Sequence, residues 1–141
     1  EMAEFGQKLG VALLGGECIE LIGDVGAGKT TLTKSIARAL GVDGPIQSPT
    51  FTICNRYETR KGLILAHYDF YRLHEAGLMR EELDETLHEP TAITIIEWGD
   101  IVADVLPSDR LTINIITTGD TSRELDCMFR GSHQTLQESL Q

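Results

Sequence analysis

The sequence predicts an α/β fold in which helices flank a mostly parallel sheet and antiparallel hairpins extend it. An apolar run at residues 18–22 leads through a glycine-rich turn into a helical pattern, as in a strand–loop–helix unit. Residues 92–98 are apolar almost throughout, as expected for a parallel strand covered on both faces. Two further pairs of strand-like segments have connections too short for a crossover helix, so each pair is expected to be antiparallel.

The turn after the first strand matches the phosphate-loop pattern G-x-x-x-x-G-K-[ST] at residues 23–30. Glycines carry no Cβ, so the backbone can curl and direct successive N–H groups toward phosphate oxygens. Lys29 would place a positive charge on the β- and γ-phosphates, and the Thr30 hydroxyl would hold Mg²⁺. The predicted architecture is therefore a three-layer sandwich like that of P-loop NTPases, with phosphates at a helix N-terminus.

Apolar periodicity predicts the helices. Residues 2–14 and the segment after the phosphate loop carry apolar side chains every three or four positions. Residues 75–87 form a further amphipathic helix whose acidic residues stay in water. A short helix over residues 100–106 stops before Pro107, and the polar tail from Ser132 onward is expected to be a frayed helix.

Two hairpins complete the predicted sheet. The first has a strand that ends at about Tyr57, a turn at residues 60–62 and a second strand over residues 63–71. The second pairs residues 110–117 with residues 123–130 around a glycine–aspartate turn, and apolar and polar residues alternate in its last strand.

Two acidic residues end predicted strands. Asp69 closes one apolar strand, and Glu97 closes the most apolar one. Open parallel sheets bind ligands at the carboxyl ends of their strands, so both carboxylates are expected to face the phosphate loop and its Mg²⁺. The alternative for each is a carboxylate that lies in solvent or caps the next helix. A charge that ends so apolar a run needs a partner.

Three other residues have open roles. Thr50 could sense the γ-phosphate as a switch threonine or bond the local backbone of a turn. His67 shares strand parity with Asp69 and is expected to be a packed, structural residue rather than a general base. Trp98, the only tryptophan, could pack in the core, stack on a base or anchor a partner.

Composition limits the class of protein. A length of 141 residues predicts a single domain over residues 1–141. The net charge of −10 disfavours direct, tight binding of nucleic acid by this chain alone. No apolar run approaches the ~20 residues of a membrane helix, and no secretory leader pattern occurs. Three cysteines without C-x-x-C spacing favour reduced, buried thiols in a cytoplasmic protein.

Four short motifs follow one another along the chain: GDVGAGKTT at 23–31, SPTF at 48–51, HYDFYRL at 67–73 and IEW at 96–98. In this order and at this length they resemble the TsaE (formerly YjeE) family, the small ATPase of bacterial tRNA threonylcarbamoyladenosine (t6A) synthesis. The resemblance covers nearly the whole chain. Its S-P-T-[FY] and H-x-D-x-Y-R elements are more specific than the phosphate loop alone.

The resemblance implies ATP and Mg²⁺ as cofactors and a weak intrinsic ATPase activity. It also implies association with the TsaB–TsaD heterodimer, whose repeated threonylcarbamoyl transfer to adenosine 37 of tRNA this ATPase would support. The transfer chemistry would belong to TsaD, and tRNA would be reached only through the complex. An adenine contact is implied just upstream of the first helix, where this chain begins.

Matching positions imply the role of each residue. Lys29 would contact the β/γ oxygens, Thr30 and Glu97 would hold Mg²⁺, and Asp69 would be a second catalytic acid. Thr50 would be the switch-like threonine, and Ser122 or Arg123 would fall on the nucleotide side. The predicted nucleotide-binding residues are Val25, Gly26, Ala27, Gly28, Lys29, Thr30, Thr31 and Ser122.

Two other classes of function use the same loop. A small-molecule or protein kinase would need an acceptor pocket and usually a lid, for which the short connections leave few residues. A nucleotide-gated binding module would bind without useful catalysis, and guanine-type switching is disfavoured because no N-K-x-D element occurs. No arginine is obviously placed to contact the γ-phosphate as an arginine finger. This favours slow intrinsic hydrolysis that a partner protein would accelerate.

Overall fold

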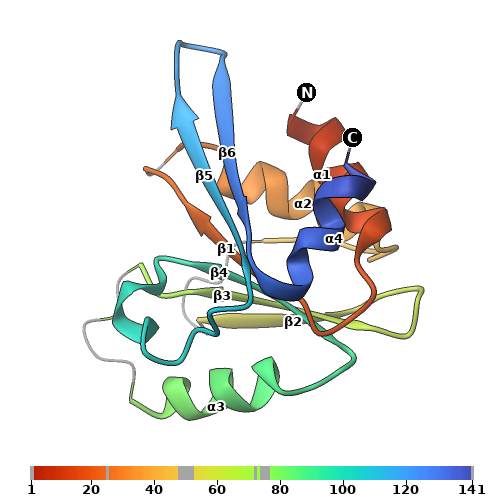
Figure 1. Cartoon of the computed structure of the whole chain (residues 1–141), viewed down its shortest axis with the longest axis vertical. Coiled ribbons are helices and arrows are strands. Elements are labelled where there is room, and N and C mark those ends of the chain that lie inside the picture. The colour runs from red at the N-terminus through yellow and green to blue at the C-terminus, as the bar shows by residue number, and fades with distance from the viewer. Residues whose placement is uncertain (1, 25, 48–52, 72, 74–76, 141) are drawn as a thin grey trace.

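The chain folds around a six-stranded sheet in this computed structural model, which describes residues 2–24, 26–47, 53–71, 73 and 77–140 (Figure 1). The strands are β1 (Cys18–Ile22), β2 (Cys54–Glu58), β3 (Ile64–Asp69), β4 (Ala92–Glu97), β5 (Leu111–Thr117) and β6 (Arg123–Phe129). Their order in the sheet is β2-β3-β4-β1-β5-β6. The four inner strands are parallel, whereas β2 and β6 pair antiparallel at the edges. The predicted sheet with two hairpin additions is confirmed.

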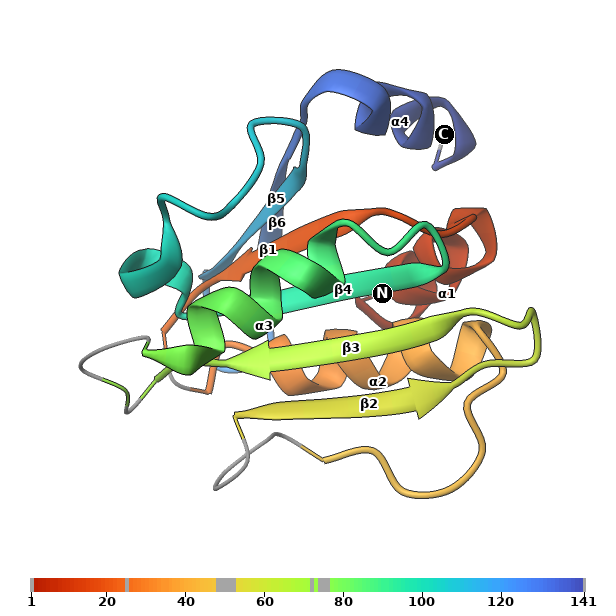
Figure 2. The same ribbon diagram turned by 90° about the horizontal axis from the view of Figure 1, so that it is seen from below.

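Helices cover both faces of the sheet, as predicted for a three-layer sandwich (Figure 2). Helices α1 (Met2–Ala12) and α2 (Lys29–Ala39) lie on one face. Helix α3 (Leu78–Leu87) and the 3-10 turn η1 (Gly99–Val102) lie on the other. Turn η2 (Gly131–His133) leads into the short helix α4 (Gln134–Ser139), which contacts α1. No helix of the described residues is long and apolar enough to cross a membrane.

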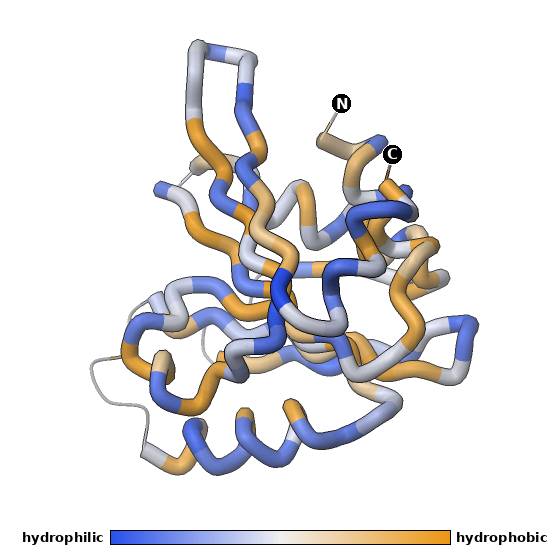
Figure 3. The backbone as a smooth tube through the Cα atoms, viewed as in Figure 1, coloured by the Kyte–Doolittle hydropathy of each residue, from blue (hydrophilic) through white to orange (hydrophobic). Residues whose placement is uncertain are grey.

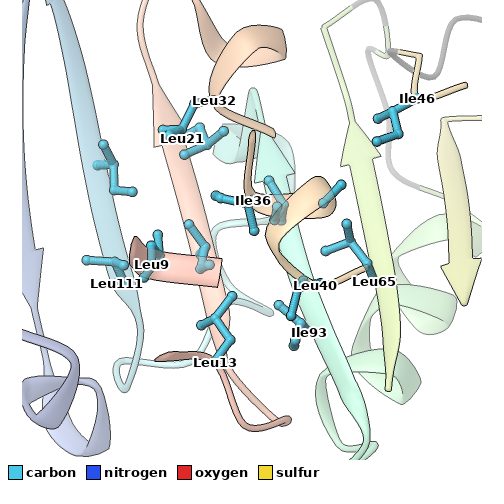
Figure 4. Packing of buried hydrophobic residues seen from close by; sticks show 14 of the residues in the cluster. Leu9, Leu13, Leu21, Leu32, Ile36, Leu40, Ile46, Leu65, Ile93 and Leu111 are labelled. Carbon is cyan, nitrogen blue, oxygen red and sulfur yellow. The ribbon is translucent and has the colours of Figure 1, made fainter. Parts of the chain in front are cut away.

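Two apolar clusters join these layers. The first joins α1 and α2 to the sheet through fully buried side chains, which include Leu9, Leu21, Leu32, Ile36 and Ile93 (Figure 4). The second joins α3 and η1 to the opposite face through Tyr68, Leu83, Ile96 and Val102. Burial of the strands between two layers explains why β4 is apolar at nearly every position.

The helix predicted over residues 75–87 corresponds to α3, with Leu83 buried and the acidic residues exposed. Hydrophilic positions predominate along α3 (Figure 3). The helix predicted over residues 100–106 is instead a 3-10 turn. Its backbone makes an i to i+3 bond from Ala103 N–H to Asp100 O at 3.3 Å, and Pro107 prevents a longer helix.

The prediction that all three thiols are buried is wrong. All three cysteines are free, but Cys18 alone is buried, whereas Cys54 and Cys127 are half-buried. The difference follows from strand position, because Cys54 and Cys127 lie on the edge strands β2 and β6. Burial raises the pKa of the Cys18 thiol to about 12.

Candidate nucleotide-binding site

Three strand ends meet at one edge of the sheet. Strand β1 runs into the phosphate loop, β3 ends at Asp69 and β4 ends at Glu97. The register pairs Asp69 with Glu97, and Glu97 in turn with Leu21 of β1. Since Leu21 precedes Gly23 by two residues, the topology brings both carboxylates beside the first glycine of the loop.

The loop backbone depends on glycine. Gly26 has a φ of 82° and Gly28 a φ of 110°, a region that residues with a Cβ rarely occupy. The Ala27 N–H donates to the Asp24 carbonyl at 3.0 Å, and α2 begins directly after Gly28. A Cβ at Gly28 would lie 3.1 Å from the thioether of Met2, so α1 also packs against this loop.

Lys29 is held inside the site. Its side chain is buried, its Nζ donates to the Gly23 carbonyl at 2.5 Å, and the same atom lies 3.8 Å from the centroid of the Trp98 ring. Burial lowers the pKa of Lys29, while the negative charges of Glu97, Asp69 and Asp24 oppose that shift. The ammonium is therefore desolvated and donates to a neutral carbonyl, for which a negatively charged phosphate oxygen would be a stronger partner.

Glu97 has the partner that its apolar strand requires. Its Oε2 lies 2.5 Å from Nε2 of His67, and both side chains are almost fully buried. The two residues lie on adjacent strands, where His67 of β3 pairs with Ile95 of β4. His67 is thus a packed residue that holds a carboxylate, in agreement with the structural role expected from the sequence.

Asp69 is more accessible than Glu97. Its Oδ1 accepts the Tyr71 N–H at 3.0 Å, and the residue is half-buried. Burial raises the pKa of Asp69, and the nearby charge of Glu97 adds to that effect, while the Tyr71 bond, His67 and Lys29 oppose it. A carboxylate with a raised pKa beside a second carboxylate is typical of functional sites.

The other predicted site residues have different positions. Thr30 is half-buried in the first turn of α2, and Thr31 beside it is exposed. Ser122 is exposed in the turn between β5 and β6, where its carbonyl accepts a bond from Arg123. Val25 and Thr50 lie outside the described residues, so their predicted roles stay predictions.

Sequence comparisons connect this geometry to a known family. The family model described as "Threonylcarbamoyl adenosine biosynthesis protein TsaE" matches residues 1–125. The chain is 37% identical over 126 residues to TsaE of Streptomyces coelicolor, a match that covers 88% of this chain and 85% of that protein. It is 40% identical to TsaE of Bacillus subtilis over 112 residues, which cover 78% of this chain and 68% of that protein.

The crystal structure of Bacillus subtilis YdiB is similar in fold, with a TM-score of 0.77 at 33% identity. That similarity covers 99% of this chain and 86% of the YdiB chain. This chain belongs to the TsaE family. The TsaE relatives are named for tRNA threonylcarbamoyladenosine biosynthesis, and this is the process to which the family assignment connects the chain.

Two features of this TsaE-family site lie beyond what residue spacing indicated. Trp98 adopts a left-handed backbone with a φ of 57°, unusual for a bulky residue, and its ring lies against Lys29 and against Tyr71 at 4.8 Å. Arg123 donates from Nε to the Ala27 carbonyl at 2.9 Å. From the sequence, Trp98 had three possible roles, and the choice between Ser122 and Arg123 was open. The contacts of Trp98 and Arg123 join segments that are distant in sequence, so no local pattern indicates them.

A cleft of about 360 Å³ opens beside Lys29 between the ends of β1, β4 and β5. Its lining includes Glu20, Gly23, Lys29, Trp98, Asp100 and Asn114. No group of three acidic, histidine or cysteine side chains within the described residues forms a metal cage. Mg²⁺ in nucleotide sites uses one or two carboxylates, a hydroxyl, water and phosphate oxygens, so Thr30 with two strand-end acids is a suitable donor set.

Proposed function

We propose that this chain is an Mg²⁺-dependent ATPase that acts as an accessory subunit of the t6A37 tRNA modification machinery and binds a TsaB–TsaD pair. One observation carries the ATPase part of the proposal: Lys29, Asp69 and Glu97 converge on a glycine loop at the carboxyl edge of the sheet. The accessory role follows from membership of the TsaE family.

The proposed chemistry uses preorganised charge. Loop N–H groups and Lys29 would bind the β- and γ-phosphates, so Lys29 would exchange the Gly23 carbonyl for phosphate oxygens. Thr30 and Glu97 would hold Mg²⁺, which when bound neutralises charge on the phosphates. Asp69, the more accessible acid, would orient the attacking water. Each such preorganised group typically contributes a rate factor of about 10²–10³.

His67 supports this assignment through Glu97. A carboxylate that binds a metal is normally held by a further hydrogen bond, which fixes its orientation. The bond between Nε2 of His67 and Oε2 of Glu97 is of this type. Glu97 is therefore proposed as the metal-binding acid, and Asp69 as the acid that acts on water.

The test compares wild-type protein with Glu97→Gln, alone and with a purified TsaB–TsaD pair. Wild-type turnover should be slow alone and faster with the pair, and the variant should bind ATP normally but hydrolyse it about 10²–10³-fold more slowly. Glu85→Gln, an exposed acid of α3, is the control and should keep wild-type turnover.

Three results would contradict the proposal: unchanged turnover in Glu97→Gln, fast hydrolysis that ignores the partner pair, or no uptake of adenine nucleotide in calorimetry. Phosphate that appears on an added acceptor rather than in water would favour a kinase. Lys29→Ala separates a scaffold from an ATPase, because a scaffold would keep its complex-forming function whereas an ATPase would lose turnover.

A further inference from the structure

Arg123 connects two segments that are distant in sequence. It is the first residue of β6 and shares strand parity with Leu125 and Phe129, which pack toward the cluster beneath α1 and α2. Its Nε donates to Ala27 O at 2.9 Å, and its Nη2 lies 3.5 Å from Gly26 O. On the other side, Nη1 donates to Ser122 O at 2.9 Å and to Gly119 O at 3.3 Å.

The guanidinium therefore has four carbonyl acceptors, two in the phosphate loop and two in the β5–β6 turn. Among the described residues no carboxylate lies within ion-pair distance of it, although the chain has 22 acidic residues. Carbonyl groups satisfy the N–H donors but leave the positive charge in place. This charge consequently adds to that of Lys29 at the phosphate loop.

The bond to Ala27 O also orients the loop. In a planar trans peptide the C=O and the following N–H point in opposite directions. When the Ala27 carbonyl points to Arg123, the Gly28 N–H must point away from Arg123. That N–H is one of the loop donors that a bound phosphate needs, and a guanidinium can hold adjacent carbonyls in a fixed geometry because its donors are rigid.

We propose that Arg123 is a positioning residue for the phosphate loop, which fixes the Ala27–Gly28 peptide and links it to the β5–β6 turn. The inference rests on the proposed function, because it assumes that the loop binds a nucleotide triphosphate. Binding of ATP at the loop then orders the β5–β6 turn, which extends beyond the body of the protein (Figure 1).

The test measures ATP affinity and hydrogen exchange in the wild type, Arg123→Lys and Arg123→Ala. Loss of hydrogen bonds from a charged group predicts an ATP Kd raised about tenfold or more in Arg123→Ala. Arg123→Lys keeps the charge but loses the planar set of N–H donors, so its ATP Kd should lie between those of the wild type and Arg123→Ala. The defect should appear mainly in KM rather than kcat. ATP should slow amide exchange at residues 117–122 in the wild type and not in Arg123→Ala.

Arg130→Ala is the matched control, because it removes the same charge from the other end of β6, where Nε donates to the Met128 sulfur, away from the phosphate loop. Equal ATP affinity in Arg123→Ala and Arg130→Ala would overturn the inference. If both Arg123 variants fail to fold, amide hydrogen exchange in the wild type tests the inference by itself. Exchange rates at residues 117–122 that do not change when ATP is added would then overturn the inference. A wild type that binds no ATP refutes the proposed function itself, whatever the variants do.

Discussion

At the scale of single residues, the position of the Glu97 carboxylate depends on His67. Within the described residues Nδ1 of His67 is buried without a hydrogen-bond partner, so the imidazole is committed to Glu97 through Nε2 alone. A neutral ring that donates from Nε2 satisfies one carboxylate oxygen and leaves Nδ1 as an unused acceptor. The ring is therefore placed to hold Glu97, although this placement leaves Nδ1 without a hydrogen bond among the described residues.

Removal of His67 should therefore destabilise the protein. His67→Ala leaves a buried carboxylate without its donor, and the loss of a buried hydrogen bond to a charged group costs about 1.5–3 kcal/mol of unfolding free energy. His67→Gln keeps an N–H donor and should recover part of that loss. Urea unfolding measures the differences, with His88→Ala, an exposed histidine at the end of α3, as the control. Equal stability of His67→Ala and His88→Ala would show that the pair is energetically neutral.

Removal of the Asp69 charge should stabilise the protein, whereas removal of His67 should destabilise it. The raised pKa of Asp69 means that its negative charge is unfavourable in the folded state. The folded protein binds this proton more tightly than the unfolded chain, so the unfavourable contribution grows as pH rises from about the ordinary value of 3.8 through the raised folded pKa. Asp69→Asn should raise Tm by about 1–3 °C at pH 7. The gain should shrink as pH falls toward 4, and a thermal scan at each pH measures it. A gain that is independent of pH would assign the effect to packing.

At the scale of elements, two glycines bring α1 close to α2 and thereby to the phosphate loop. A Cβ at Gly6 would lie 2.6 Å from the Ser35 side chain, and one at Gly10 would lie 2.6 Å from the Cβ of Ala39. One turn separates the two glycines, so they lie on one face of α1. The close approach also places Met2 against Gly28 at the start of α2.

A double-mutant cycle tests this helix contact. Gly6→Ala should lower the unfolding free energy by about 1–2 kcal/mol, since overpacking outweighs the gain of up to ~1 kcal/mol in helix propensity. Ser35→Gly removes both atoms that the new Cβ would meet at 2.6 Å, so the double variant should be more stable than additivity predicts. If the changes in unfolding free energy of the two single variants are additive, then α1 moves away from α2 at Gly6 without resistance from Ser35.

At the scale of the whole molecule, charge is distributed unevenly. The chain has 22 acidic and 12 basic residues, for a net charge of −10, yet Lys29 and Arg123 both contact the phosphate loop. A negative molecule with cations at one loop favours a polyanionic ligand there over a nucleic-acid backbone spread across its surface. This distribution supports the proposed function, in which tRNA would be reached only through partner subunits.

Sequence alone was sufficient for most of the helices and strands, the fold class and the position of the two acids, although the helix expected at residues 100–106 is a 3-10 turn. Phosphate-loop spacing located a strand, a turn and a helix, and two short connections located the hairpins. The rule that parallel strands end at one edge placed Asp69 and Glu97 beside the loop. These features depend on the local periodicity of apolar residues and on short, right-handed connections between strands. Both can be inferred directly from the sequence.

Tertiary structure decided which side chains meet. Arg123 contacts Ala27 across 96 residues, and His67 contacts Glu97 across 30. The contact of Lys29 with the ring of Trp98 likewise joins the start of α2 to the end of β4. Such contacts depend on strand order, register and side-chain orientation, which are set by packing of the whole sheet between its two helical layers. No short segment of the sequence contains that information.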